Sequence, residues 1–374
     1  MGIRPTVALI NEDALRDNYL KIKALTEPST CVMAIIKANG YGHGEAIVAK
    51  ALTSAGASTF GVAIIEEGVS LRRGGVSYPI VILGGVYPEQ IKDLLDFNLT
   101  PVVFDIANAR LINEASQKKG QVTPVHIKID TGMGRLGIMP TQVLEFFAEL
   151  KSLTSISVEG ILSHLARSES KKEPDITETK KQLQIFKEAS RAARSIGFNP
   201  KYTHIANSAA ILDYKDSHLS MIRPGLMLYG AYPAPDLRER IALTPVMTLK
   251  TRILEIKKMP KGSPISYGGR FVTKRGSLIA TIPIGYGDGL PRAYSSKGEV
   301  LVRGKRVPIA GTICMDLTMI DVTDIGDVRK NDEVIIIGSA EKETITVEEV
   351  AERTSTISYE IFCNISARVP RLQA

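Results

Sequence analysis

The sequence predicts an α/β protein with an N-terminal (β/α)₈ barrel of the TIM type and a mostly-β C-terminal domain. Between about residues 31 and 230, short apolar runs alternate with stretches of helical spacing, in roughly eight strand-then-helix units. From about residue 241 onward, β-rich runs separated by Gly-rich turns replace this alternation. The chain of 374 residues is long enough for two hydrophobic cores. We therefore expect a barrel over residues 1–240 and a β domain over residues 241–374.

The expected elements follow the chain in order. A short strand at residues 6–10 precedes a helix that starts near residue 11, and residues 1–10 can pair with the β domain. The expected barrel strands are CVMAIIK, TFGVA, PIVILGG, LTPVVFD, PVHIKID, ISVEGILSH, YTHIAN and IRPGLMLYG. Helical spacing marks residues 43–56, 140–151 and 177–197. In the β domain, the β-rich runs are followed by one short expected helix, VEEVAERT.

Composition and charge exclude several classes of protein. The formal net charge is +7, but the basic residues form no stripe interleaved with aromatic residues, so we expect no nucleic-acid partner. The 3 cysteines are widely spaced without a CxxC pair, which argues against a disulfide framework or zinc site and suits a reducing cytoplasm. No stretch has the apolar length of a membrane span, and no export signal is evident. We expect a cytoplasmic protein that acts on a small molecule without a metal.

The stretch VMAIIKANGYGHG, residues 32–44, carries the strongest local signal. Its apolar run ends at Lys37, which points into the barrel mouth if the strand assignment is right. Partial desolvation lowers the pKa of an amine, and a neutral amine forms Schiff bases with carbonyls, including the aldehyde of pyridoxal phosphate (PLP). The loose, glycine-rich loop that follows permits close backbone approach, and Tyr41 can offer a hydroxyl to a phosphate. A solvent-facing lysine is the alternative for Lys37 alone.

Polar side chains also end other predicted strands. These residues are Lys128, Asp130 and Arg135 in HIKIDTGMGRLG, His164 in ILSH, Asn207 and Ser208 in YTHIANS, and Arg223 and Gly225 in MIRPGLMLYG. Because the C-terminal ends of barrel strands meet at one mouth, these groups converge on a common site if the barrel prediction holds. Taken singly, His164 or His204 is more often a hydrogen-bonded core residue than a catalyst.

A competing motif lies at residues 132–137, where GMGRLG matches the GxGxxG fingerprint of dinucleotide-binding folds. Glu159 ends the next strand about where a ribose-binding acid belongs. In such a fold the helix would already run at the second glycine, which would place Pro140 inside it at a cost of about 3 kcal/mol. Pro140 is better placed to open the later helix TQVLEFFAELK, so we expect no nicotinamide cofactor.

The second domain contains the motifs ISYGGR, IPIGYGDGLPR, AGTICMD and YEIFCNISARVPR. Tyr267 and Tyr286 each stand beside a flexible glycine, with Arg270 or Asp288 nearby. Considered without the barrel motifs, hairpin turns with tyrosines at their rim are the simpler interpretation.

Taken together, the motifs resemble those of the alanine racemase family of PLP-dependent enzymes along nearly the whole chain. Nine motifs occur in the family's order: RPTVALINEDALRDNY, IIKANGYGHG, KIDTGMGRLG, LSHLA, HIANSAAIL, MIRPGLMLYG, ISYGGRF, IPIGYGDGLPR and AGTICMDLTMID. The resemblance implies a homodimer in which the β domain of one subunit closes the active site of the other. It also implies interconversion of L-alanine and D-alanine, which supplies D-alanine for peptidoglycan.

The resemblance implies roles for individual residues. Lys37 would hold PLP covalently and act as one base, and Tyr267 of the partner subunit would be the second base. The remaining cofactor-binding residues would be Tyr41, His164, Asn207, Ser208, Arg223, Gly225, Leu226 and Tyr359. Arg135, and Met315 through its backbone, would hold the substrate carboxylate. Supporting or access roles would fall to Lys128, which is often carbamylated in the family, and to Tyr286 and Asp316.

The chemistry makes physical sense of these roles, because racemisation removes the α-proton from one face and returns a proton to the other. A phenol needs help to act as a base at neutral pH, and the resemblance implies a hydrogen-bonded chain from Tyr267 through His164 to Arg223. A guanidinium at Arg223 beside the pyridine nitrogen opposes protonation of that nitrogen, so the ring is a weaker electron sink. We expect this to limit reprotonation at the wrong carbon, which would cause transamination.

Two stretches depart from the commoner family pattern, and three alternatives stay open. Gly40 replaces a frequent Ala, which should loosen the loop slightly, and residues 165–169 differ from the usual Phe-Ala-x-Ala-Asp near the substrate access route. The alternatives are a racemase for another amino acid such as serine, a decarboxylase of the same plan, and a non-enzymatic PLP carrier. Arg223, where a decarboxylase would need an acid, argues against the second. A carrier would lack residues 241–374 and therefore Tyr267, which argues against the third.

Overall fold

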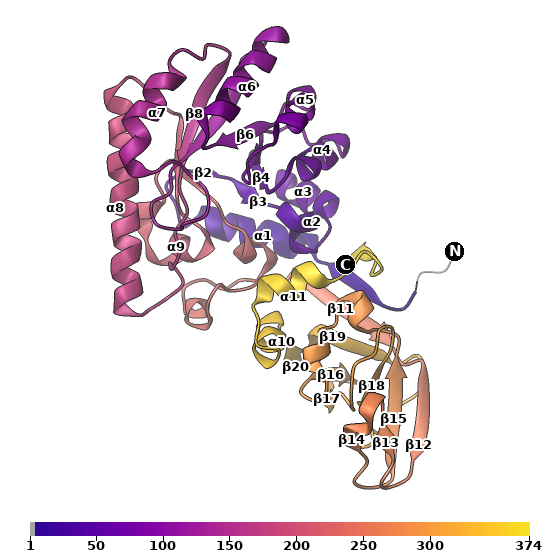
Figure 1. Ribbon diagram of the computed structural model, residues 1–374. Coiled ribbons are helices and arrows are strands. Elements are labelled where there is room, and N and C mark those ends of the chain that lie inside the picture. Colours follow the sequence, from indigo (N-terminus) through magenta and orange to yellow (C-terminus); the bar gives the residue numbers. More distant parts are fainter. Residues whose placement is uncertain (1–3) are drawn as a thin grey trace.

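The computed structural model describes residues 4–374 as a barrel domain and a strand-rich domain (Figure 1). Figure 1 shows helices around the parallel strands of the barrel, and the C-terminal part of the chain, in orange and yellow, forming the second domain beside it. Both parts therefore match the predicted fold class, which is confirmed.

A curled parallel sheet forms the wall of the barrel. Seven strands lie in the order β3-β4-β5-β6-β7-β8-β9, and β2 and β10 form a separate parallel pair. Because the N–H of Arg223 donates to the carbonyl of Ala206 at 3.0 Å, β10 also lies against the end of β9. The strands are β2 (Cys31–Val32), β3 (Ala34–Ile35), β4 (Phe60–Val62), β5 (Ile80–Ile82), β6 (Thr100–Val103), β7 (Thr123–Lys128), β8 (Ile156–Leu162), β9 (Tyr202–His204) and β10 (Met221–Ile222). Seven of the eight predicted apolar runs coincide with strands, and the first is divided into β2 and β3. The run IRPGLMLYG was mostly wrong as a strand: it shares only Ile222 with β10, because Pro224 lacks the N–H that a strand donates, and residues 226–229 form a 3₁₀ turn.

Several helices belong to this part of the chain, and most of them cover the outside of the sheet (Figure 1). They are α1 (Glu12–Lys23), α2 (Lys37–Tyr41), α3 (Glu45–Ser54), α4 (Ile65–Arg73), α5 (Ile91–Asp96), α6 (Ile106–Lys118), α7 (Val143–Leu150), α8 (Glu173–Ser195) and α9 (Ser208–Asp213). The side chain of Asn11 caps α1 by accepting the N–H of Ala14. The helix expected from residue 177 begins earlier, because Pro174 fits the first turn of α8. Among residues 4–374, no helix combines the length and the apolar character that crossing a membrane requires.

Short 3₁₀ turns connect many of these elements. They are η1 (Pro88–Gln90), η2 (Pro140–Gln142), η3 (Lys215–Ser217), η4 (Leu226–Tyr229), η5 (Pro235–Glu239), η6 (Tyr267–Gly269), η7 (Tyr286–Asp288) and η8 (Arg292–Tyr294). Pro140 opens η2, which leads into α7, as expected.

The barrel strands β4, β5 and β6 are buried at every residue, which explains why they appear in the sequence as uninterrupted apolar runs.

The second domain is built on a sheet of order β17-β16-β19-β11-β1-β21, with β20 paired to β19, and a smaller sheet of order β12-β15-β18. Its strands are β11 (Met247–Arg252), β12 (Glu255–Met259), β13 (Pro264–Ile265), β14 (Phe271–Val272), β15 (Ser277–Ile282), β16 (Glu299–Val302), β17 (Lys305–Pro308), β18 (Thr318–Asp321), β19 (Glu333–Ala340), β20 (Glu343–Ile345) and β21 (Arg371–Gln373). The expected helix is α10 (Val347–Arg353), and a second helix, α11 (Ser358–Asn364), was not expected.

The beginning and the end of the chain meet in the larger sheet of this domain. Strand β1 (Val7–Ile10) pairs antiparallel with β11 and parallel with β21. We expected that residues 1–10 can pair with this domain. Of these, residues 1–3 lie outside the residues that the structure describes. The N-terminal strand therefore leads from the β domain into α1 of the barrel.

Candidate active site

A cavity of about 740 Å³ opens at the C-terminal end of the barrel strands. It is lined by eleven of the residues that the sequence singled out: Lys37, Tyr41, Lys128, Arg135, His164, Asn207, Ser208, Arg223, Gly225, Leu226 and Tyr359. The structure thus brings the predicted strand-end groups to one mouth. Tyr359 comes from α11 of the second domain, so that helix forms part of the same wall.

Lys37 begins a turn of unusual backbone geometry rather than a loose loop. Residues 38–41 all have φ between 50° and 61°, which makes this a left-handed turn. Such a conformation costs roughly 1–2 kcal/mol per non-glycine residue, and Gly40, which is buried, adopts it without that penalty. Burial, assisted by the charge of Arg135, lowers the pKa of Lys37 below its ordinary value.

Glu67, which the sequence reading missed, holds this turn in place. One of its carboxylate oxygens accepts the N–H of Ala38 at 2.5 Å, and the other accepts the N–H groups of Ala63 and Ile64 at 2.8 and 3.3 Å. The carboxylate therefore ties the residue after Lys37 to the end of β4. Its negative charge also opposes the lowering of the Lys37 pKa. Applying the strand-end rule to TFGVA and the residues after it would have pointed to the pair Glu66 and Glu67, without showing which of the two contacts the turn.

A cradle of hydroxyl and amide groups, formed by Tyr41, Ser208 and Gly225, lines the same cavity. The N–H of Gly225 donates to the Ser208 hydroxyl at 3.0 Å. A Cβ added at Gly225 would lie 2.6 Å from the Tyr41 hydroxyl oxygen, so only glycine fits there. The Asn207 side chain accepts the N–H of Ala210 and thereby caps α9, which starts at Ser208.

Arg223 is buried at the base of the cavity and is held on several sides. Its guanidinium donates to the carbonyls of Ser163 at 2.6 Å and Ile205 at 3.2 Å. It also contacts Nδ1 of His204 at 2.8 Å and Nδ1 of His164 at 3.3 Å. Burial lowers the pKa of Arg223 to about 9, which leaves the group protonated near neutral pH.

The histidines around Arg223 are uncharged at neutral pH. Burial first, and then the charge of Arg223, lowers the pKa of His164 and of His204 well below the ordinary value. Behind them, Nδ1 of His126 lies 2.8 Å from Nε2 of His204, and burial lowers the pKa of His126 to about 3. Because these rings are neutral, each can accept a hydrogen bond at one nitrogen and donate a hydrogen bond from the other. Arg223 is therefore the positive charge of this cluster.

Asp130 organises the loop that carries Arg135. Its carboxylate accepts the N–H groups of residues 132–135 at 2.9 to 3.1 Å. Partial burial opposes ionisation, but these N–H groups hold the pKa of Asp130 below its ordinary value. The GxGxxG stretch is thus a loop around a carboxylate, with no helix starting at its second glycine. Nearby, burial and then Arg135 lower the pKa of Lys128 to about 8.

Four predicted residues of the β domain lie outside this cavity. Tyr267 is 72% exposed, and Tyr286, Met315 and Asp316 are also exposed. Their loops are joined to one another: the Thr312 hydroxyl donates to the carbonyl of Tyr267, and the N–H of Tyr286 donates to the carbonyl of Cys314. The structure therefore gathers these residues at one place in the β domain, apart from the residues that line the cavity.

The fold and the cavity together define an α/β-barrel enzyme with a lysine and a buried arginine at the barrel mouth. Residues 10–233 match the alanine racemase N-terminal domain, and residues 246–373 match the alanine racemase C-terminal domain. The chain belongs to the alanine racemase family, whose members are isomerases.

Individual relatives agree with this assignment. The alanine racemase of Halothermothrix orenii is 45% identical, over 98% of this chain and 96% of its own length. That of Geobacter sulfurreducens is 43% identical, over 100% of this chain and 98% of its own. The structure of the Clostridium difficile 630 enzyme superposes with a TM-score of 0.94 at 38% identity, covering 100% of this chain and 97% of that one. The structure of the Bacillus anthracis enzyme superposes with a TM-score of 0.92 at 34% identity, covering 100% of this chain and 96% of that one.

Proposed function

We propose that this protein is a PLP-dependent alanine racemase that interconverts L-alanine and D-alanine with one base on each face of the α-carbon. The observation that carries the proposal is the convergence of Lys37, Arg223 and the Tyr41–Ser208–Gly225 cradle on one cavity. The similar structures add support: one from Bacillus anthracis contains L-Ala-P, and one from Clostridium difficile contains cycloserine.

PLP fits the residues at the barrel mouth. The amine of Lys37 would bind its aldehyde, and Tyr41, Ser208, Tyr359 and the backbone at Gly225 and Leu226 would hold its phosphate. The rings of Tyr41 and Tyr359 lie 5.8 Å apart, and residue 225 has room only for glycine beside the Tyr41 hydroxyl. Asn207 would act by starting α9 at Ser208. When bound, the cofactor supplies an electron sink for the charge left at the α-carbon after proton removal.

Arg223 would face the ring nitrogen of the cofactor. Because it is protonated and the neighbouring histidines are neutral, it would oppose protonation of that nitrogen. This would keep the electron sink weak and limit transamination. Replacing Arg223 with Glu should raise pyruvate formation during turnover, and an unchanged pyruvate yield would remove this role from Arg223.

Lys37 and Tyr267 of the partner subunit would be the two bases. Tyr267 projects from an exposed loop of the β domain and does not line the cavity of its own chain. The proposal therefore requires a homodimer in which the β domain of each subunit covers the barrel mouth of the other. The contact between Arg223 and His164 supports the hydrogen-bonded chain expected from Tyr267 of the partner subunit through His164 to Arg223.

Arg135, together with the backbone of Met315, would bind the substrate carboxylate. Lys128 lies in the same cavity, and its lowered pKa increases the fraction of neutral amine. A neutral amine can add to CO₂ and release a proton, which leaves a carbamate whose negative charge would pair with Arg135. A ¹³C NMR signal from ¹³C-bicarbonate should appear in the wild type and be absent in Lys128→Ala. A spectrum without that signal in the wild type would rule the carbamate out.

The proposed role in the cell is the supply of D-alanine for peptidoglycan in the cytoplasm. The deciding experiment incubates the purified protein and PLP with L-alanine, L-serine or L-lysine and measures each D-enantiomer by chiral chromatography. We expect D-alanine to form fastest. Faster formation of D-serine or D-lysine would assign the other substrate, and the absence of any D-product would contradict the proposed function.

A further inference from the structure

The loops that carry Tyr286 and Met315 extend beyond the strands that support them. The first follows β15 and contains η7, and the second precedes β18. The N–H groups of Tyr286 and Gly287 donate to the carbonyls of Cys314 and Met315 at 3.0 and 2.9 Å. A Cβ at Gly285 would lie 2.2 Å from the Cys314 carbonyl oxygen, so glycine is required for this close approach. The two loops are therefore fixed to each other, and something else must fix the pair to the domain.

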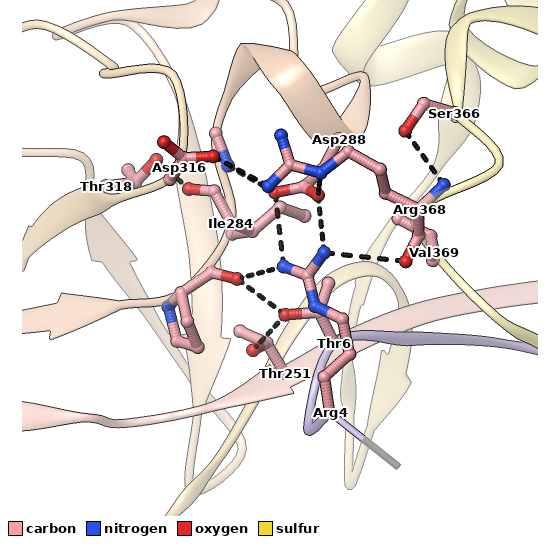
Figure 2. A network of polar contacts seen from close by, with 12 residues as sticks. Arg4, Thr6, Thr251, Ile284, Asp288, Asp316, Thr318, Ser366, Arg368 and Val369 are labelled. Atoms are coloured by element: carbon pink, nitrogen blue, oxygen red, sulfur yellow. Dashed lines mark hydrogen bonds and ion pairs between the residues drawn. The ribbon is translucent and has the colours of Figure 1, made fainter.

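Asp288, at the end of η7, is the group that does this. Its side chain is fully buried, and one of its oxygens accepts the N–H of Gly285 at 3.1 Å. Figure 2 shows the guanidinium groups of Arg4 and Arg368 on either side of the Asp288 carboxylate. Arg4 contacts its two oxygens at 2.6 and 3.3 Å, and Arg368 lies 3.5 Å from one of them. A buried carboxylate is thus balanced by cations from the two ends of the chain.

The network continues to the second loop. A terminal nitrogen of Arg368 donates to the Asp316 carboxylate at 2.6 Å, next to Met315. The other terminal nitrogen would lie 2.5 Å from a Cβ at Gly287, so Arg368 packs directly against the backbone beside Tyr286. Arg4 also donates to the carbonyl of Pro283 at 2.8 Å, at the base of the first loop. The network thus connects both loops to the Asp288 carboxylate, and it extends beyond them to the hydroxyls of Thr6 and Thr251 (Figure 2).

We propose that Asp288 is a positioning residue, and that its network with Arg4, Arg368 and Asp316 holds the Tyr286 and Met315 loops in the geometry that receives substrate. This inference rests on the proposed function, in which these loops face the active site of the partner subunit. Small displacements of groups that bind substrate weaken binding before they affect the bases themselves. The network should therefore control KM more than kcat.

The test compares Asp288→Asn, Arg368→Gln and Arg368→Lys in the PLP-loaded dimer. We expect Asp288→Asn and Arg368→Gln to raise KM for L-alanine about ten-fold while kcat falls less than about three-fold. Hydrogen exchange should speed up about ten-fold or more in peptides that contain Tyr286, Gly287 and Met315, and not elsewhere. Arg368→Lys should have a KM between those of Arg368→Gln and the wild type, since an ammonium group can reach one carboxylate but cannot bridge two.

Asp332→Asn is the matched control. Asp332 pairs with Arg303 at 2.8 Å in the same domain, away from both loops, so its loss should leave KM and loop exchange unchanged. The proposal would be overturned if the Asp288→Asn variant were dimeric and had the KM and the loop hydrogen exchange of the wild type. It would also be overturned if hydrogen exchange became faster throughout the domain and KM and kcat changed by the same factor. If Asp288→Asn does not fold, Arg368→Gln decides by the same criteria. A wild type that makes no D-alanine would refute the proposed function instead, because loop exchange is measured without turnover.

Discussion

Lys37 is surrounded by charges of both signs. Arg135 and Arg223 lower its pKa, and Glu67 raises it, while burial is the largest effect and lowers it. The strand-end pattern was sufficient to single out Lys37, because an ammonium group at the end of an apolar run is visible in the sequence. Glu67 was missed because the contact that ties it to the turn is with the N–H of Ala38, 29 residues away in the chain. Such contacts leave no periodic signal.

The variant Glu67→Gln tests whether Glu67 holds the turn after Lys37 and raises the pKa of that lysine. An amide has a single acceptor oxygen, so the variant can keep the bond to Ala38 or those to Ala63 and Ile64, but not both. We expect a loss of about 1 kcal/mol in the free energy of unfolding and a further lowering of the Lys37 pKa. The pH profile of PLP uptake by the apoprotein should therefore shift to lower pH. Glu66→Gln, which changes an adjacent exposed carboxylate, is the control, and identical profiles for the two variants would exclude this role for Glu67.

The left-handed turn at residues 38–41 is the element that places both Lys37 and Tyr41. It packs on α11, since the residue that ends it, Gly42, touches the backbone at Phe362. The centre of the His43 ring, next along the chain, lies 4.6 Å from that of the tilted Tyr229 ring and 4.7 Å from that of Phe362, which it meets edge-to-face. The geometry of the turn therefore depends on a helix more than 300 residues away in sequence, at residues 358–364.

Gly42→Ala should disrupt this contact. A Cβ at Gly42, where φ is +77°, would lie 2.0 Å from the Phe362 carbonyl oxygen, and backbone atoms cannot easily move away. Gly56→Ala is the matched control, because φ there is +94° and a Cβ would meet nothing within 4 Å. We expect Gly56→Ala to cost about 1 kcal/mol in urea unfolding and Gly42→Ala about 3 kcal/mol or more, with weaker PLP binding. Equal costs would show that the contact with α11 is unimportant.

The strands of the barrel were predictable and the turns between them were not. Apolar runs buried on both faces mark β4, β5 and β6 whatever their surroundings. By contrast, NGYGHG was expected as a loose loop, and Gly40 as a residue that loosens it, whereas the segment is a compact left-handed turn. Helix α11 was missed because no side chain caps its start at Ile357, whereas the equally short α10 begins at the capping residue Thr346. In both cases contacts between distant segments decide the local conformation.

Stability of the whole molecule should depend on pH through its histidines. Of the 5 histidines, His43, His126 and His204 are buried and His164 is half-buried, and each has a lowered pKa, to about 4 for His43 and about 3 for His126. Since the unfolded value is about 6.5, the unfolded chain binds more protons as the pH falls below it. Each such histidine should therefore reduce the free energy of unfolding by up to about 1.4 kcal/mol per pH unit below about pH 6.5, with full stability above it.

Urea unfolding followed by circular dichroism at pH 7.5, 6, 5 and 4.5, at one protein concentration, measures this slope. His43→Phe keeps an aromatic ring against Tyr229 and Phe362 and removes one titrating group. The free energy of unfolding of this variant should therefore fall less steeply with decreasing pH, by the equivalent of about one proton. A wild-type stability that does not change from pH 6.5 to 5 would show that these histidines are not kept neutral by folding.

The proposed sharing of each active site between two subunits concerns the whole molecule. Lys37 lines the cavity and Tyr267 is exposed on the β domain, so each variant that removes one of them should leave the other intact. The most direct test mixes Lys37→Ala and Tyr267→Phe protein after subunit dissociation and measures racemisation of alanine. Each pure variant should be nearly inactive, and random reassociation should restore about a quarter of wild-type activity, because half of the dimers carry one intact site. A mixture as inactive as its components would contradict an active site shared between subunits.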